Sequence, residues 1–267
     1  MAVERRGAAI EIVGLRKEYL SGQGRVLALD DISLRIAPGE FVCVVGPSGC
    51  GKSTLLRILA GLDTQTGGTI KVESPGWAVQ NAMVFQESGL FPWMSVETNV
   101  GFGLMTRGVG AHEAAGRVDA ALKLVGLTKF RKHYPHQLSG GMRQRSAIAR
   151  AFVTDPGMLL MDEPFAALDA QNRVILQAEL VRIWEQTRKT VVYITHSIEE
   201  ALLLGDRTVV MTAQPGQIKR IIDVPFARPR NVMMLSASAE FGQLKLDIWQ
   251  VLEAEVTRAR AEAEAET

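Results

Sequence analysis

The amino-acid sequence predicts an α/β fold: a mostly parallel sheet with an antiparallel β edge region and an inserted helical subdomain. The main observation is that short apolar runs, each bounded by turn or polar residues, alternate with segments of helical patterning. This alternation is typical of parallel strands joined by helices. A second observation is a stretch in the middle of the chain with helical patterning and no clear strand signal. The length of 267 residues suits one large domain that carries such an insertion.

Five apolar runs are predicted to form the parallel sheet, because near-continuous hydrophobicity suits strands that helices cover on both faces. These runs are FVCVV (41–45), AMVF (82–85), MLLM (158–161), TVVYIT (190–195) and TVVM (208–211). Two further segments, IEIV near residue 10 and GTIKV near residue 68, are interpreted as antiparallel edge strands. The sequence QIKRIIDV, which follows Gly216, is predicted to be the last strand.

The predicted elements divide the chain into three parts. Residues 1–91 and 157–222 are predicted to form the α/β core, and residues 92–156 the helical subdomain. The remainder, residues 223–267, is predicted to be a helical extension, because its apolar residues from Phe241 onward follow the spacing of an amphipathic helix. We expect this helix to pack on the body of the protein and its Ala/Glu-rich end to fray.

Composition narrows the classes of function. The chain has 30 basic and 29 acidic residues, so it lacks the broad basic field that holds nucleic acid, and no nucleic-acid partner is expected. Its two cysteines, Cys43 and Cys50, do not form a disulfide framework and suit a reducing compartment. We find neither a convincing signal peptide nor an apolar run of roughly 18 residues. The protein is therefore expected to be cytoplasmic and to reach a membrane only through a partner.

The strongest functional pattern is GPSGCGKS, which follows a predicted strand and precedes a predicted helix. This is the phosphate-loop pattern in its required strand–loop–helix setting. Glycines let the backbone turn so that its N–H groups face phosphate oxygens, and the helix N-terminus adds a favourable dipole. The residues predicted to bind nucleotide here are Gly46, Pro47, Ser48, Gly49, Cys50, Gly51, Lys52, Ser53 and Thr54.

Individual roles within this loop follow from side-chain chemistry. Lys52 is expected to reach the β- and γ-phosphates, Ser53 to bind Mg²⁺, and Thr54 to hydrogen-bond the α-phosphate. Because Cys50 lies inside the loop, we expect bound ATP to shield its thiol from thiol reagents. The sequence thus predicts a site for ATP and Mg²⁺.

Acidic residues follow another predicted strand in MLLMDEP. Ligands bind at the carboxyl ends of strands in open α/β sheets, so Asp162 is expected to hold Mg²⁺ and Glu163 to act as the general base. His196, after TVVYIT, could contact the γ-phosphate and orient the attacking water. Gln86, after AMVF, could approach the Mg²⁺ and water, and the ring of Tyr19 could stack on adenine. Taken singly, a lone His is more often structural and a lone Gln is weak evidence, while a single aromatic such as Tyr19 is as typical of the core as of a nucleotide site.

A second anion-facing helix start is predicted at LSGGMRQR. Ser139 is a good N-cap, Gly140 and Gly141 follow it, and the next residues have helical patterning. One chain rarely needs two such helix starts for one phosphate chain. The economical interpretation is that each copy offers this element to the ATP held by another copy.

Together these motifs resemble the ATP-binding cassette family over roughly residues 8 to 222, and they occur in the family's order. Along the chain they are Tyr19, the phosphate loop, Gln86, LSGG, MLLMDEP, ALD from Ala167 to Asp169, and His196. The resemblance implies a RecA-like phosphate-loop NTPase fold that hydrolyses ATP with Mg²⁺. The chain departs from the commonest signature at Met142, where many cassettes carry Gln, and we expect this change to alter affinity more than activity.

The resemblance also implies roles at a subunit interface. Ser139, Gly140 and Gly141 would bind the γ-phosphate of an ATP held by the partner in a head-to-tail dimer. Asp169 would cross that interface and couple the two sites. The segment after Gln86 would meet a helix of a membrane-spanning permease subunit.

A narrower resemblance is to the ATPase subunits of nitrate, sulfonate and taurine importers. It is carried by ESGLFPWMSVETNV, YPHQLSGGMRQR and THSIEEALLLGDRTVVM. Membership would imply a second ATPase subunit (a homodimer), permease subunits and, indirectly, an extracytoplasmic solute-binding protein. The protein would then lie peripherally on the cytoplasmic face of the cell membrane.

Three alternatives stay open at the level of sequence. The chain could serve another small-solute importer, or an exporter or lipid transporter, since these share the same motor. A cassette acting on nucleic acid or the ribosome is disfavoured. The segment between Gln86 and Ser139 lacks sustained heptads, and the chain carries one phosphate loop.

Overall fold

The computed structural model describes residues 7–22, 24–73 and 79–265. Its larger sheet has six strands in the order β5-β6-β7-β3-β8-β9. The first five run parallel, and β9 pairs antiparallel with β8 at one edge. The bounds are β3 Phe41–Val45, β5 Val79–Val84, β6 Pro156–Asp162, β7 Thr190–Ile194, β8 Arg207–Met211 and β9 Ile218–Asp223. All five runs predicted as parallel strands lie in this sheet.

A second, three-stranded antiparallel sheet has the order β2-β1-β4, with bounds β1 Ala9–Ser21, β2 Gly24–Ile36 and β4 Gly67–Glu73. The interpretation of the segment near residue 10 as an edge strand is wrong, because β1 lies in the middle and pairs on both sides. Strand β2 was not predicted, although Ile32, Leu34 and Ile36 alternate with exposed residues. Toward the N-terminus of β2, register shifts and the left-handed backbone of Asp31 interrupt this alternation.

The core forms two layers around the parallel sheet, as strand β3 illustrates. Phe41, Cys43 and Val45 belong to a cluster on one face with the helices, whereas Val42 and Val44 belong to a cluster on the other face with the three-stranded sheet. Successive side chains of a strand point to opposite faces. Burial on both faces explains why these strands appear in the sequence as unbroken apolar runs.

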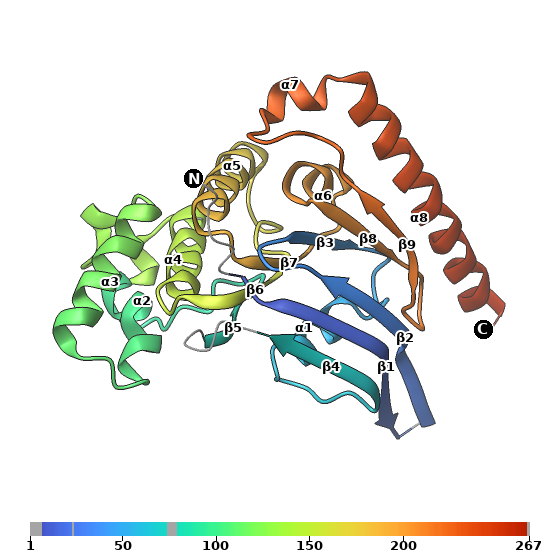
Figure 1. Cartoon of the computed structure of the whole chain (residues 1–267), viewed down its shortest axis with the longest axis horizontal. Coiled ribbons are helices and arrows are strands. Elements are labelled where there is room, and N and C mark those ends of the chain that lie inside the picture. The colour runs from blue at the N-terminus through green and yellow to red at the C-terminus, as the bar shows by residue number, and fades with distance from the viewer. Residues whose placement is uncertain (1–6, 23, 74–78, 266–267) are drawn as a thin grey trace.

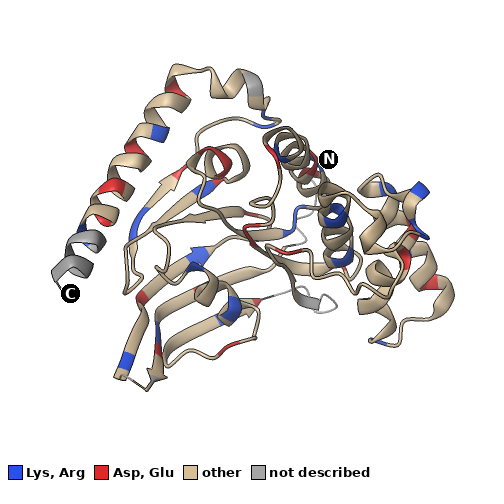
Figure 2. Cartoon of the chain, turned by 180° about the vertical axis from the view of Figure 1, so that it is seen from behind, with Lys and Arg blue, Asp and Glu red and all other residues tan. Residues whose placement is uncertain are grey.

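Between β5 and β6, the described chain is helical, and it forms the group at one side of the molecule in Figure 1. Its elements are α2 Val96–Met105, α3 Ala111–Leu124, the 3-10 turns Thr128–Phe130 and Pro135–Gln137, and α4 Gly140–Phe152. The remaining helices of the body are α1 Lys52–Leu59, α5 Ala170–Thr187 and α6 Ile198–Leu204. Basic and acidic residues are distributed over both sheets and the helices (Figure 2).

The chain continues after β9 into α7 Val232–Ser236 and the long helix α8 Ala239–Ala265, which runs along the edge of the molecule beside α6 and β9 (Figure 1). Phe241 and Ile248 on α8 are fully buried against the body, in agreement with the predicted amphipathic helix. Among the described residues, none of the helices combines the length and the apolar character needed to cross a membrane.

Candidate nucleotide-binding site

The phosphate loop connects the end of β3 to the start of α1, at the carboxyl edge of the parallel sheet. Gly51 has φ of 92°, and a Cβ there would lie 2.6 Å from Leu29 Cδ2 and 2.8 Å from Ala28 O. Only glycine fits a left-handed backbone this close to β2. The buried Lys52 donates from Nζ to Gly46 O at 2.9 Å and Pro47 O at 2.8 Å, so the loop folds around its ammonium group.

Over this loop lies a cavity of about 380 Å³. The lining combines the loop with residues from five other places in the sequence, among them the predicted base and His196. The lining residues are Tyr19, Val26, Ala28, Ser48, Gly49, Cys50, Gly51, Lys52, Ser53, Thr54, Glu163, His196 and Gln214. The fold therefore gathers the phosphate loop, Tyr19, Glu163 and His196 around one space.

Two polar pairs lie at the end of this cavity where β6 and β7 terminate. Ser53 Oγ donates to Asp162 Oδ1 at 3.1 Å, and His196 Nε2 lies 2.6 Å from Glu163 Oε1. Glu163 has a left-handed backbone with φ of 46°, and its N–H donates to Ile194 O at 3.1 Å. A non-glycine residue held in this region is unusual and typical of functional sites.

The residues present fit the groups that the motifs imply. Mg²⁺ prefers oxygen ligands and binds through one or two carboxylates together with water and substrate phosphates. The Ser53 hydroxyl and Asp162 carboxylate form such an oxygen pair beside the loop. Gly49 has φ of 79°, and a Cβ there would have no atom within 4 Å, so the backbone facing the cavity is uncovered. Such a loop can present N–H groups to an anion.

Tyr19 is held by two residues that the sequence analysis did not identify. Its hydroxyl donates to Asp63 Oδ2 at 2.7 Å, while the Lys17 ammonium lies 4.7 Å from the ring centroid. Lys17 also donates to Asp63, and the hydrogen bonds from Lys17 and Tyr19 lower the pKa of the Asp63 carboxyl to about 2. No short-range pattern links Asp63 to Tyr19, because 44 residues separate them.

The structure contradicts the expectation that ATP would control the exposure of Cys50. Its side chain is already fully buried, and burial raises the pKa of the thiol despite the opposing influence of Lys52. Thiolate is the reactive form, so a buried thiol with a raised pKa reacts slowly whether or not nucleotide is bound. The reason is that the side chain points under the loop, 2.8 Å from where a Cβ on Gly46 would lie.

The signature helix α4 begins outside the phosphate-loop cavity. Ser139 Oγ accepts from Met142 N at 3.3 Å, as an N-cap does, and Ser139 and Gly140 are exposed while Gly141 is partly so. Gln86 also does not line the phosphate-loop cavity. It lines a second cavity of about 480 Å³ with Glu87, Ser88, Gly140, Arg143, Gln144, Pro164, Ala167 and Leu168.

Asp169 begins helix α5 as its N-cap. Its Oδ1 accepts from Asn172 N at 3.0 Å, and Oδ2 accepts from the Asn172 side chain at 2.7 Å. These two hydrogen bonds hold the pKa of the exposed Asp169 carboxyl below its usual range. Asp169 is therefore a fixed, charged group on the surface.

Comparison with known proteins identifies the class to which this fold and site belong. The family model described as ABC transporter matches residues 29–166. A Methanocaldococcus jannaschii protein described as an uncharacterized ABC transporter ATP-binding protein is 46% identical over 261 residues, covering 96% of each chain. The chain belongs to the ABC transporter family. Since ATP hydrolysis coupled to transport is characteristic of this family, the protein is an ATP-hydrolysing cassette subunit.

Two further relatives are named as import ATP-binding proteins, and one solved structure has a similar fold. The taurine import ATP-binding protein TauB of Jannaschia is 46% identical over 224 residues, 83% of each chain. The nitrate import ATP-binding protein NrtD of Synechocystis is 45% identical over 218 residues, 80% of this chain and 82% of its own. A dimeric, post-hydrolysis cassette structure with ADP and Pi has a TM-score of 0.71 at 32% identity, covering 82% of this chain and all of its own.

Proposed function

We propose that the chain is the ATPase subunit of an importer for a small solute of the nitrate, sulfonate or taurine type. The proposal is supported by the names of its relatives, which include aliphatic sulfonate import ATP-binding proteins at 41% and 43% identity. The chain would lie on the cytoplasmic face of the cell membrane. There it would bind permease subunits, and an extracytoplasmic binding protein would deliver the solute.

Within one protomer, the phosphate-loop cavity supplies the groups for hydrolysis. Glu163 accepts the proton of the attacking water, and His196, 2.6 Å from the Glu163 carboxylate, orients this base and contacts the γ-phosphate. Lys52 stabilises negative charge on the transferred phosphoryl group. Ser53 and Asp162 would hold Mg²⁺, which supplies neutralisation of phosphate charge.

The observation that carries the proposal of a working pair is the location of the signature. Ser139 and Gly140 are exposed and lie outside the phosphate-loop cavity, so one protomer surrounds only part of the terminal phosphate. In a head-to-tail dimer, the capped start of α4 would supply the missing donors from the partner. ATP bound at both interfaces would favour the closed pair, and hydrolysis would remove that preference.

Transmission to the membrane would pass through the segment that follows Gln86. Arg150 on the signature helix donates to Ser88 O at 3.0 Å and Gly89 O at 2.8 Å, so this segment is tied to α4. Close by, Trp93 is 70% exposed, and its ring centroid lies 5.6 Å from that of the partly buried Phe91, with the two rings tilted by 38°. An exposed aromatic side chain is typical of a protein-binding surface, and we assign Trp93 to contact with the permease.

The decisive experiment is purification of the native complex from membranes. We expect permease subunits to co-purify with this chain and ATP hydrolysis to rise when the loaded binding protein is added. The binding protein should then be screened by calorimetry against nitrate, taurine and alkanesulfonates. Recovery of the chain without membrane subunits, or stimulation by none of these solutes, would contradict the corresponding part of the proposal.

A further inference from the structure

The turn between β8 and β9, residues 212–217, forms one wall of the phosphate-loop cavity. Gln214 lines the cavity, and Gly216 packs so closely on the loop that a Cβ there would lie 2.0 Å from Cys50 O. The N–H of Gly216 also donates to Ala28 O at 3.0 Å, which joins the turn to β2. The position of this turn therefore bears directly on the shape of the loop that holds phosphate.

Hydrogen bonds within the turn connect its two ends. The buried Thr212 hydroxyl donates to Pro215 O at 2.9 Å and accepts from Gln217 N at 2.9 Å, while Thr212 N donates to Gln217 O at 2.9 Å. The hydrogen bonds to β2 hold the Gly216 end of the turn. An attachment at Ala213 therefore fixes the other side, next to Gln214, which lines the cavity.

A residue of the C-terminal helix makes that attachment. Glu255 on α8 is 3% exposed, and its Oε2 accepts from Ala213 N at 3.2 Å. The same carboxylate is paired with Lys219 Nζ at 3.1 Å and with Arg258 Nη2 at 2.9 Å. A buried carboxylate is costly unless its partners satisfy it, so this arrangement holds α8 and the turn in a fixed relation.

Helix α8 is anchored to the body at another place as well. Lys245 is paired with Glu199 on α6 at 2.5 Å, and Ile248 is buried. Helix α6 begins two residues after His196, the side chain beside the predicted base. Helix α8 therefore contacts the 212–217 turn, which contributes Gln214 to the cavity, and also helix α6, which follows His196.

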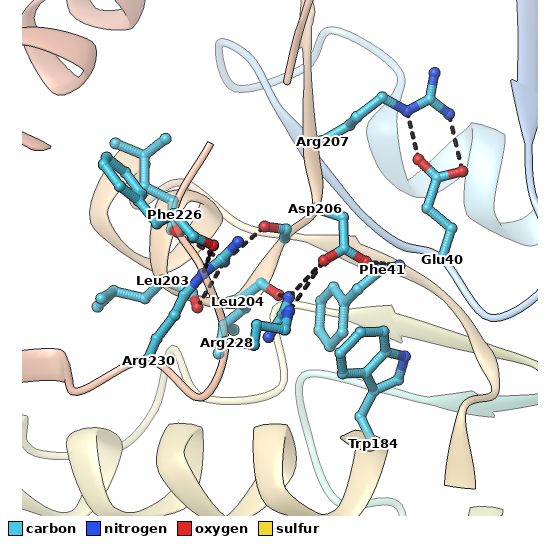
Figure 3. A network of polar contacts seen from close by, with 12 residues as sticks. Glu40, Phe41, Trp184, Leu203, Leu204, Asp206, Arg207, Phe226, Arg228 and Arg230 are labelled. Atoms are coloured by element: carbon cyan, nitrogen blue, oxygen red, sulfur yellow. Dashed lines mark hydrogen bonds and ion pairs between the residues drawn. The ribbon is translucent and has the colours of Figure 1, made fainter. Parts of the chain in front are cut away.

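The link between β9 and α7 is fixed independently (Figure 3). Arg230 Nη1 donates to the carbonyl oxygens of Leu202 and Gly205 at the end of α6, at 3.1 Å and 2.7 Å. Arg228 pairs with Asp206 at 2.9 Å and lies 4.3 Å from the ring centroid of Trp184. Because these contacts hold the start of the extension, loss of Glu255 removes the attachment of Ala213 to α8 and leaves the extension in place. The Gly216 end of the turn stays joined to β2.

We propose that Glu255 is a positioning residue for the nucleotide site. By accepting the hydrogen bond from Ala213, it keeps the 212–217 turn against the phosphate loop, and α8 thereby sets the affinity for nucleotide. The inference rests on the proposed role of the phosphate-loop cavity in binding ATP. It gives the C-terminal extension a function that the motifs of the cassette do not assign.

The test compares Glu255→Met, which keeps the volume but cannot accept the hydrogen bond, with Glu255→Gln, whose side-chain oxygen can. In the Met variant we expect the Kd for a fluorescent ATP analogue to rise about fivefold to tenfold, as for loss of one hydrogen bond. The kcat at saturating ATP should stay within about twofold. The Gln variant should retain an affinity close to that of the wild type.

Hydrogen exchange in the nucleotide-free proteins gives a second readout that does not depend on activity. We expect faster exchange in the Met variant at the amides of residues 212–217, with unchanged exchange in α4. Wild-type affinity together with wild-type exchange in the Met variant would overturn the proposal. Equal loss of affinity in the Met and Gln variants would overturn the assigned role of the hydrogen bond.

The outcomes also separate this inference from the proposed function. If the wild type failed to bind the nucleotide, the role of the cavity would be wrong, whereas the exchange experiment would still test the attachment of the turn. If the Met variant failed to fold, Glu255→Ala would replace it. That variant removes the acceptor and leaves Lys219, about half exposed at 49%, able to turn to solvent.

Discussion

The phosphate loop and the start of the signature helix α4 are both glycine-rich helix starts, yet the first is packed into the protein and the second is exposed. The loop is packed into the body: Gly51 lies against β2, and Lys52 is buried and bonded to the loop's own carbonyl groups. The start of α4 is capped by Ser139 but exposed, with Gly140 open to solvent. The comparison indicates that the phosphate loop is preorganised within the protomer, whereas the start of α4 is open to solvent, as the proposed contact with a partner requires.

The largest expected effect tests the chemistry on the preorganised side. Glu163→Gln removes the general base and keeps the shape of the side chain, so we expect hydrolysis to fall by about 10²-fold to 10⁴-fold with ATP binding retained. Phosphate release measures the first effect, and gel filtration with ATP should reveal an accumulated dimer. Wild-type turnover in this variant would remove Glu163 from the role of base.

The second prediction distinguishes the two halves by complementation. Lys52→Ala should abolish ATP hydrolysis by disabling the phosphate loop. Gly140→Asp should abolish it by disabling the start of α4, because it places a negative charge where a phosphate would bind. An acidic residue in the first turn favours the helix itself, so the Asp variant should remain folded.

Mixing these two variants is the informative measurement. In a head-to-tail pair, a mixed dimer contains one site with both changes and one intact site, so activity should return on mixing at about a quarter of the wild-type level or less. Each variant alone, measured at the same total concentration, is the control. Absence of any recovery in mixtures shown to contain mixed dimers would indicate that each protomer completes its own site.

A third prediction concerns binding rather than hydrolysis. Lys52→Ala also removes the ammonium that bonds Gly46 O and Pro47 O, so both the loop and its charge are affected. We expect the Kd for ATP to rise by at least about tenfold, since charge-assisted hydrogen bonds are stronger than neutral ones. Fluorescent-nucleotide titration measures it, with Gly140→Asp as the control that should bind ATP to the isolated protomer normally.

The smallest effect concerns the support of Tyr19. The pKa of Asp63 is lowered to about 2 by hydrogen bonds from Lys17 and Tyr19, so its charged form stabilises the fold above its ordinary pKa near 4. This contribution disappears as the pH falls through about 2. Asp63→Asn should therefore lower stability by under about 1 kcal/mol at pH 7, and the difference should shrink between pH 4 and 2.

Denaturant unfolding of the wild type and the Asn variant across this pH range measures the effect, while Glu18→Gln, at a partly exposed carboxylate on the same strand, provides a control. A difference in stability that stayed constant down to pH 2 would contradict the assigned cause. A weaker affinity of the Asp63→Asn variant for an adenine nucleotide would further support the predicted stacking of Tyr19 on the adenine ring.

The residues that could be predicted are those whose chemistry is expressed in a few consecutive positions. The phosphate loop needs glycines and a lysine at fixed spacing, and strands β3, β6 and β7 are buried on both faces, so both leave unbroken patterns in the sequence. Strand β2 was missed because a local irregularity at Asp31 interrupts its alternation. The burial of Cys50 was missed because it depends on the direction in which a loop side chain points.

The sequence by itself determined the α/β class and the composition of the loop, because backbone conformation and helix dipoles act over a few residues. Only the tertiary structure brought Asp63 to Tyr19, separated Gln86 from the phosphate-loop cavity, and placed Glu255 against Ala213. These contacts join residues far apart in the chain. They arise from how two sheets and the C-terminal helix pack together, and no local pattern encodes that packing.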